Sequence, residues 1–231
     1  EKNASLAIVQ NDVMYYAYTG TDLYSGSGKI KGFSAVAGLY DESVQIVTCD
    51  KDIASVADLK GRVVSVGDAG SGVEFNAKQI LEAYGLSFSD ISVVNASFDA
   101  SAAGLAGGTI DAAFIVAGAA IHLIDIDEER IGILGERYGF YTATTIPSKT
   151  YAGVEGDVST VSVRATLVAS DRLDKAFVYE LVSLLFEKQE DLAAGEWKFA
   201  EVNLTDATKG IEIPFHEGAK RYYHEQQLEG F

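Results

Sequence analysis

The sequence is poor in cysteine, proline and basic side chains, and these shortages narrow the classes of protein it can belong to. Its 231 residues include one cysteine, Cys49, which permits no internal disulfide, and only 2 prolines. Lys and Arg number 18 against 34 Asp and Glu, which gives a formal net charge of −16. Because such a charge repels phosphate backbones, we expect no nucleic-acid partner.

Long apolar runs and metal-ligand patterns are also missing. No stretch approaches the roughly 20 apolar residues that a membrane-spanning helix needs. The first residues, "EKNASLAIVQNDV", lack the basic start, apolar stretch and cleavage site of a signal peptide. The three histidines, His122, His216 and His224, show no zinc-ligand spacing, so we predict no metal site.

What is present is the composition of an ordered globular protein. Apolar side chains make up 48% of the residues and charged ones 23%, and Gly, with 23 residues, far outnumbers Pro. The length suits two lobes of roughly 100 residues each. Both a sizeable core and a two-lobed arrangement are therefore expected.

Hydrophobic periodicity predicts alternating strands and helices, and hence an α/β fold with mostly parallel sheets. Expected strands cover 5–10, 29–40, 42–49, 62–67, 91–97, 109–119, 130–136 and 160–170. Expected helices cover 11–19, 72–84, 98–108, 174–194 and the neighbourhood of 214–226, while 137–157 is interpreted as a loop. In the helix over 174–194 the apolar stripe is assigned to Phe177, Leu181, Leu184 and Leu185.

A glycine-rich turn, "GDAGSG" at 67–72, follows the strand at 62–67 and precedes a helix. It lacks the Lys of an ATP-binding loop and the glycine spacing of a dinucleotide site, so we expect no cofactor. The free N–H groups at the helix start, beside Ser71 and Gly72, favour a carboxylate. The alternative is that Ser71 only caps its own helix. Asn76 offers a donor and an acceptor toward the strand end, or is an ordinary exposed helix residue.

A second polar group follows the strand at 5–10. "VQNDVMYYAY" combines neutral hydrogen-bonding side chains with tyrosines, a set suited to solute binding, and we select Gln10 and Tyr16 as contacts. Enzyme signatures are absent from the sequence: no nucleophile elbow occurs and Cys49 has no neighbouring His. Arg62 and Arg164 could bind a substrate acid, but structural ion pairs explain them equally well.

Four stretches carry a resemblance to a known family. "LAIVQNDVMYYAY", "DLKGRVVSVGDAGSGVEFNA", "FIVAGAA" and "IPSKTYAGVEGDVSTVSV" resemble, in order, the motifs of the solute receptors of the TAXI subfamily of TRAP transporters. The resemblance implies a two-lobed type II periplasmic binding fold without enzymatic activity. It also implies ligand contacts in an interlobe cleft, namely Gln10, Tyr16, Gly70, Ser71, Gly72, Val73, Asn76, Val116, Ala117 and Gly118.

The chain departs from that family at several points. Val73 stands where the family has Thr, Asn11 replaces Ser, Ala120 replaces Pro, and Arg164 replaces an uncharged residue. Such receptors begin with a further strand, turn and helix, so we expect several tens of residues of the first lobe to be missing. Lobe 1 is then 1–52 with 163–231, lobe 2 is 53–162, and the two crossings form a hinge.

These observations predict an extracytoplasmic receptor, periplasmic or lipid-anchored at the cell surface. It would bind a small organic acid or acidic amino acid, similar to glutamate or 2-oxoglutarate, and deliver it to the subunits of a TRAP membrane permease. The alternative is a sensory or surface-antigen module that uses the same fold without transport.

Overall fold

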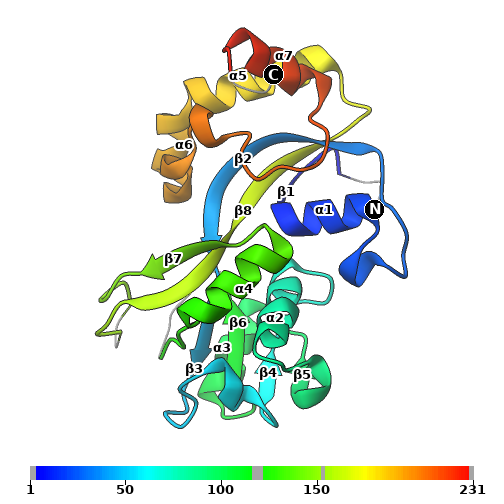
Figure 1. Ribbon diagram of the computed structural model, residues 1–231. Coiled ribbons are helices and arrows are strands. Elements are labelled where there is room, and N and C mark those ends of the chain that lie inside the picture. Colours follow the sequence, from blue (N-terminus) through cyan, green and yellow to red (C-terminus); the bar gives the residue numbers. More distant parts are fainter. Residues whose placement is uncertain (1–3, 116–121, 152–153, 229–231) are drawn as a thin grey trace. The chain divides into compact units, whose positions relative to one another are not determined.

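The computed structural model describes residues 4–115, 122–151 and 154–228, and the chain divides into two compact units (Figure 1). Unit 1 holds the described residues of Glu1–Asp41 and Arg164–Phe231, and unit 2 those of Glu42–Val163. Two long strands, β2 (Phe33–Ser43) and β8 (Val158–Ser170), have residues in both units. The lobe boundaries expected from the sequence stay a prediction; in the structure, β3 (Gln45–Thr48) pairs with a strand of unit 2.

In unit 1, β1 (Leu6–Gln10) runs antiparallel to β8, with Gln10 opposite Ala165. The helices of this unit are α1 (Asn11–Thr19), α5 (Lys175–Glu187), α6 (Gln189–Gly195) and α7 (Glu217–Glu225). Tyr223 of α7 is fully buried in the core, and its hydroxyl donates to the Val36 carbonyl of β2 at 2.7 Å. This bond fastens the last helix to the sheet.

Unit 2 contains a four-stranded sheet with the order β3-β6-β4-β5. Its other strands are β4 (Val63–Ser65), β5 (Ser92–Val94) and β6 (Ala112–Ile115), and its helices are α2 (Gly72–Ala83), α3 (Phe98–Ala106) and α4 (Glu128–Tyr138). β4 is parallel to β5 and β6, whereas β3 is antiparallel to β6. The prediction of parallel strands is therefore confirmed for the pairings of β4 with β5 and β6. It is wrong for the pairings of β3 with β6 and of β1 with β8.

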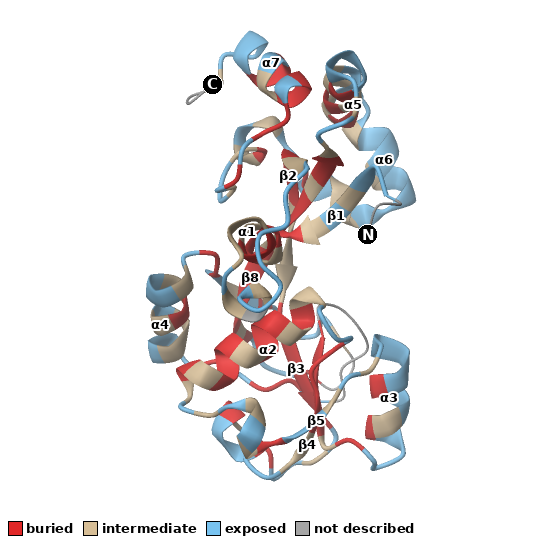
Figure 2. Ribbon diagram, turned by 90° about the vertical axis from the view of Figure 1, so that its right-hand side faces the viewer, coloured by how far each residue is buried: buried red, intermediate tan, exposed pale blue. Residues whose placement is uncertain are grey.

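Helices cover both faces of the unit 2 sheet, which confirms the α/β class. Phe114 of β6 packs in one apolar cluster with Ile80 of α2, and Ile115 packs in another with Leu105 of α3. Figure 2 shows β3 buried, in red, while the outer surface of α3 is exposed. Short 3-10 helices occur at Asp22–Tyr24, Val56–Leu59, Phe88–Asp90, Trp197–Glu201 and Leu204–Asp206.

Two secondary-structure predictions are wrong. Residues 130–136, expected as a strand, lie in α4, because Asp127 caps that helix through the Arg130 N–H and Gly139 ends it with a φ of +74°. The expected loop at 137–157 contains β7 (Thr142–Ile146), which pairs antiparallel with β8. The alternating "TATTI" of β7 lies on the sheet edge, where its polar side chains stay exposed.

The apolar stripe of α5 also differs from the prediction. The side chains that α5 buries are Val178, Val182 and Leu185, whereas Phe177 and Leu184 are each 49% exposed. The sequence offered two overlapping stripes that share Leu185, and the packing in unit 1 selects the one with Val178 and Val182. In the described part of the chain, no helix is long and apolar enough to cross a membrane.

Candidate functional site

Several chain segments meet at one edge of the unit 2 sheet, the edge at which β4, β5 and β6 end. β3 begins there, because it is antiparallel to β6 and Gln45 lies opposite Ile115. Extending the register of β4 by two residues brings Gly67 to the level of Ile115 and Ala96, and the Ala96 N–H donates to the Gly67 carbonyl at 3.2 Å. Ligands in α/β folds bind at such carboxyl edges.

The glycine turn leads from β4 to α2 at this edge. Gly67 has a φ of +83°, and a Cβ placed on it would lie 2.7 Å from the Cβ of Val73. Gly70 has a φ of +77°, with open space around it. Gly67 is therefore required for the close approach of α2, whereas Gly70 serves only the left-handed backbone.

The start of α2 is satisfied in part by the protein's own side chains. Ser71 Oγ accepts the Glu74 N–H at 3.3 Å, so Ser71 does cap its own helix. The Glu74 carboxylate accepts the Gly70 N–H at 2.6 Å and an Asn95 amide N–H at 3.2 Å. No described group accepts from the N–H of Gly72 or Val73. Two backbone donors thus remain at a position that favours negative charge.

The side chains of Val73 and Asn76 point into unit 2 rather than to its surface. Val73 belongs to the apolar cluster between α2 and the sheet, so its side chain is used in packing. Asn76 is completely buried, and its amide donates to the Tyr141 hydroxyl at 3.1 Å. The Tyr141 hydroxyl in turn donates to Gln79 Oε1 at 2.8 Å. Asn76 is not the exposed helix residue of the alternative interpretation.

In unit 1, the structure places Gln10 at the end of β1 and Tyr16 within α1. Both are buried, and the Tyr16 ring meets Tyr15 edge-on with centroids 5.9 Å apart. Gln10 is the N-cap residue of α1, but its side chain makes no capping hydrogen bond. α1 therefore begins immediately after β1, without an intervening turn.

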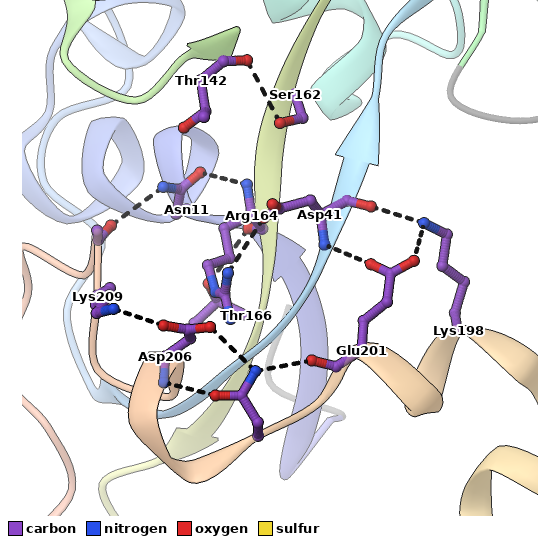
Figure 3. Close-up of polar contacts among 12 residues, drawn as sticks. Asn11, Asp41, Thr142, Ser162, Arg164, Thr166, Lys198, Glu201, Asp206 and Lys209 are labelled. Atoms are coloured by element: carbon purple, nitrogen blue, oxygen red, sulfur yellow. Dashed lines mark hydrogen bonds and ion pairs between the residues drawn. The ribbon is translucent and has the colours of Figure 1, made fainter. Parts of the chain in front are cut away.

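Asn11 and Arg164 belong to a polar network within unit 1 (Figure 3). Asn11 Oδ1 accepts the Arg164 backbone N–H at 3.1 Å, and Asn11 Nδ2 donates to the Gly210 carbonyl at 3.1 Å. Arg164 Nη1 pairs with Asp41 at 3.2 Å. In the same network, hydrogen bonds from Lys209 and Asn203 lower the pKa of Asp206. Arg164 and also Arg62, which pairs with Asp50 at 3.2 Å, thus form structural ion pairs.

Three side chains that lie near the edge of the unit 2 sheet were not among the predicted contacts. They are Gln45, Glu74 and Tyr151, and Gln45 Nε2 donates to the Tyr151 hydroxyl at 2.8 Å. A glutamine within the otherwise apolar strand sequence "VQIV" was the available signal for Gln45. The expected contacts Val116, Ala117 and Gly118 lie outside the described residues.

The two α/β units match solved structures of periplasmic solute-binding proteins. A structure described as the periplasmic sulfonate-binding protein SsuA of Methylobacillus flagellatus KT has a TM-score of 0.50 and 15% identity, covering 98% of this chain and 77% of that one. SsuA from Escherichia coli is 16% identical with a TM-score of 0.44, and the match covers 96% of this chain and 63% of that one. This chain thus spans less than two thirds of the E. coli protein's length.

A substrate-binding protein of an ABC uptake transporter from Streptococcus pneumoniae, with bound histidine, is 15% identical with a TM-score of 0.43. That match covers 81% of this chain and 68% of that one. The sequence itself shows the family. The chain belongs to the NMT1-like family, whose model matches residues 1–226.

Proposed function

We propose that the protein is a solute receptor outside the cytoplasm, in the periplasm or anchored by a lipid at the cell surface. It captures a small organic acid or amino acid, releases it unchanged, and is not an enzyme. The observation that carries this proposal is the carboxyl edge of the unit 2 sheet, where the glycine turn presents the N–H groups of Gly72 and Val73, for which the described residues provide no acceptor. The match to periplasmic solute-binding folds supports the same class.

We take the proposed contacts of each unit from the TAXI resemblance. Unit 1 contributes Gln10 and Tyr16, and unit 2 contributes the turn, the helix start and the segment after β6. The unit 2 set is Gly70, Ser71, Gly72, Val73, Asn76, Val116, Ala117 and Gly118. In this proposal Gly72 and Val73 act through their backbone N–H groups, and Asn76 acts by holding the first turns of α2 against Tyr141.

A thermal-shift screen tests the proposed class. The panel contains organic acids, amino acids and alkanesulfonates, because sulfonate is the solute in the description of the Methylobacillus protein. A solute present at 100 times its dissociation constant stabilises the folded state by about 2.7 kcal/mol. A panel in which no compound raises the melting temperature would contradict solute binding.

Two substitutions test the location of the site. Ser71→Ala and Asn76→Ala should each weaken binding of the best compound, measured by calorimetry on folded protein. Ser97→Ala, at the corresponding cap of α3, is the matched control and should leave the affinity unchanged. If both site variants bind as tightly as the parent, the solute lies elsewhere.

We further propose a TRAP-type permease as the partner, on the strength of the TAXI resemblance. Proteoliposomes that contain the TRAP permease encoded beside the gene should take up the solute only when this protein is added. Uptake through an ABC permease instead would replace the partner while leaving the receptor function intact.

A further inference from the structure

Gln45 is a buried polar side chain whose hydrogen bonding is incomplete. It opens β3 at the carboxyl edge of the unit 2 sheet, and only 5% of its surface is exposed. Its Nε2 donates to Tyr151, but no donor in 4–115, 122–151 or 154–228 reaches its Oε1. Leaving a buried carbonyl oxygen without a donor is costly, so such an atom calls for a partner outside the described chain.

Tyr151 completes a pair of hydrogen-bonding groups at this position. Its hydroxyl oxygen accepts from Gln45, which leaves the hydroxyl proton to donate to another group. Gln45 lies opposite Ile115, the last residue of β6, and Tyr151 packs against the same apolar cluster as Ile115. The pair therefore presents one acceptor and one donor beside the end of β6.

The distance from this pair to the glycine turn suits a small solute. Gln45 of β3 lies opposite Ile115 of β6, and Gly67, two residues beyond β4, reaches the level of Ile115 when the register of β4 with β6 is extended. With strands about 4.8 Å apart, the backbone of Gln45 lies roughly 10 Å from that of Gly67. A molecule with five or six heavy atoms in its main chain can bridge that separation once the side chains are counted.

The charge at the turn adds a second, independent constraint. The Glu74 carboxylate already lies on the Gly70 N–H, and it brings a negative charge to the edge that the solute would contact. This charge offsets part of the attraction of the helix start for a carboxylate, whereas it attracts an ammonium group. Both the Gln45 acceptor and the Glu74 charge thus favour a solute that carries N–H donors.

We propose that Gln45 and Tyr151 recognise the head group of an α-amino acid. The Gln45 Oε1 atom accepts from the ammonium group, and the Tyr151 hydroxyl donates to the neighbouring carboxylate. The solute is thus an amino acid rather than a 2-oxo acid or a plain dicarboxylate. This inference rests on the proposed receptor function and narrows its substrate class.

The test compares solutes that differ only at this head group. Calorimetry on the 231-residue chain uses glutamate against 2-oxoglutarate, alanine against pyruvate, and leucine against 4-methyl-2-oxopentanoate. In the best-binding pair the amino acid should bind at least tenfold more tightly, as expected for a charged hydrogen bond. Gln45→Met should bring this ratio close to one by weakening the amino acid alone.

Two further variants separate recognition from folding. Tyr151→Phe removes one hydroxyl while keeping the ring, and it should also reduce the ratio. Ser101→Ala removes a buried hydrogen bond to Ser65 on the α3 side of the same sheet, at 2.7 Å, and should leave the ratio at its parental value. The control therefore reports on stability without touching the pair.

The failures of the two proposals are distinguishable. Tight binding of a 2-oxo acid or an alkanesulfonate without a preference for amino acids would overturn the Gln45 inference and leave the receptor function standing. An unchanged ratio in both Gln45→Met and Tyr151→Phe would do the same. The receptor function itself fails only if the whole panel, amino acids included, leaves the protein unbound.

Discussion

Each unit has a helix that begins near the end of a strand, but the two junctions are built differently. In unit 1, β1 ends at Gln10 and α1 begins at Asn11, with no residue between them. In unit 2, β4 ends at Ser65, and α2 begins at Gly72 after a six-residue turn. The turn contains Gly67 and Gly70, both with left-handed backbone, whereas the direct junction has no turn residues at all.

The acidic residues at the two helix starts extend this comparison. Asp12 Oδ1 accepts the Val13 N–H at 2.7 Å, and Glu74 Oε2 accepts the Gly70 N–H at 2.6 Å. Asp12 is completely buried, whereas Glu74 is partly exposed. A carboxylate of the chain thus accepts a backbone N–H group at each junction. Of these two carboxylates, only Glu74 is exposed enough to contact a solute directly. The four predictions below test this difference.

The largest effect is expected at Gly67. Gly67→Ala places a Cβ 2.7 Å from the Val73 Cβ and 3.0 Å from Ser71 Oγ, at a φ of +83°. Overpacking and left-handed backbone strain together should lower the free energy of unfolding by about 3 kcal/mol. Urea denaturation measures the loss.

Gly70→Ala is the matched control, because Gly70 has a similar φ of +77° but no atom within 4 Å of the added Cβ. It should cost about 1 kcal/mol, the strain of the backbone alone. Equal losses in the two variants would mean that the approach of α2 to the sheet does not depend on Gly67.

The next effect concerns the direct junction in unit 1. Asn11 is buried and satisfies the Arg164 N–H and the Gly210 carbonyl with one side chain. Asn11→Ala leaves both backbone groups without that partner and should lower the free energy of unfolding by about 2 kcal/mol. Asn203→Ala, which removes an exposed cap on Asp206 in the same network, should cost about 1 kcal/mol. If Asn203→Ala lowers the free energy of unfolding by more than Asn11→Ala does, the hydrogen bonds of Asn11 are not what fixes α1 in place.

Much of this difference between the junctions could be predicted from the sequence. The strand at 5–10, the turn at 67–72 and the helix after it follow from periodicity and glycine placement, and the structure has all three. Gly20 ends α1 in the left-handed conformation, as its position indicated. These features depend on residues close together in the chain.

The parts that could not be predicted depend on distant contacts. The helix at Glu128–Tyr138 has an apolar run that also suits a strand, and its Asp127 and Gly139 caps decide the outcome. The Gln45–Tyr151 pair joins residues 106 positions apart, and Asn11 bridges to a carbonyl 199 positions away. No local sequence pattern predicts such pairings. Asn76 could therefore be predicted as a contact, but its Tyr141 partner could not.

A smaller effect is expected at the cap of α2. Ser71→Ala removes the acceptor for the Glu74 N–H and should lower the free energy of unfolding by about 1 kcal/mol. Ser97→Ala removes the equivalent acceptor at α3 and should cost a similar amount. The two variants should therefore match in urea denaturation and differ in solute affinity. A loss of affinity in both would show that helix stability, rather than the turn, controls binding.

The smallest change in stability is expected from Glu74→Gln. The amide can still accept the Gly70 N–H but carries no charge near the start of α2, so the free energy of unfolding should fall by only about 0.5 kcal/mol. The same change removes the repulsion between this edge and an anionic solute. Affinity for 2-oxo acids and dicarboxylates should rise, and the gain should shrink as salt increases, because the charge is partly exposed. Calorimetry at two ionic strengths measures both. A gain that is absent at low salt would mean that Glu74 acts on the backbone alone, and the electrostatic contrast between the two junctions would then have no part in solute choice.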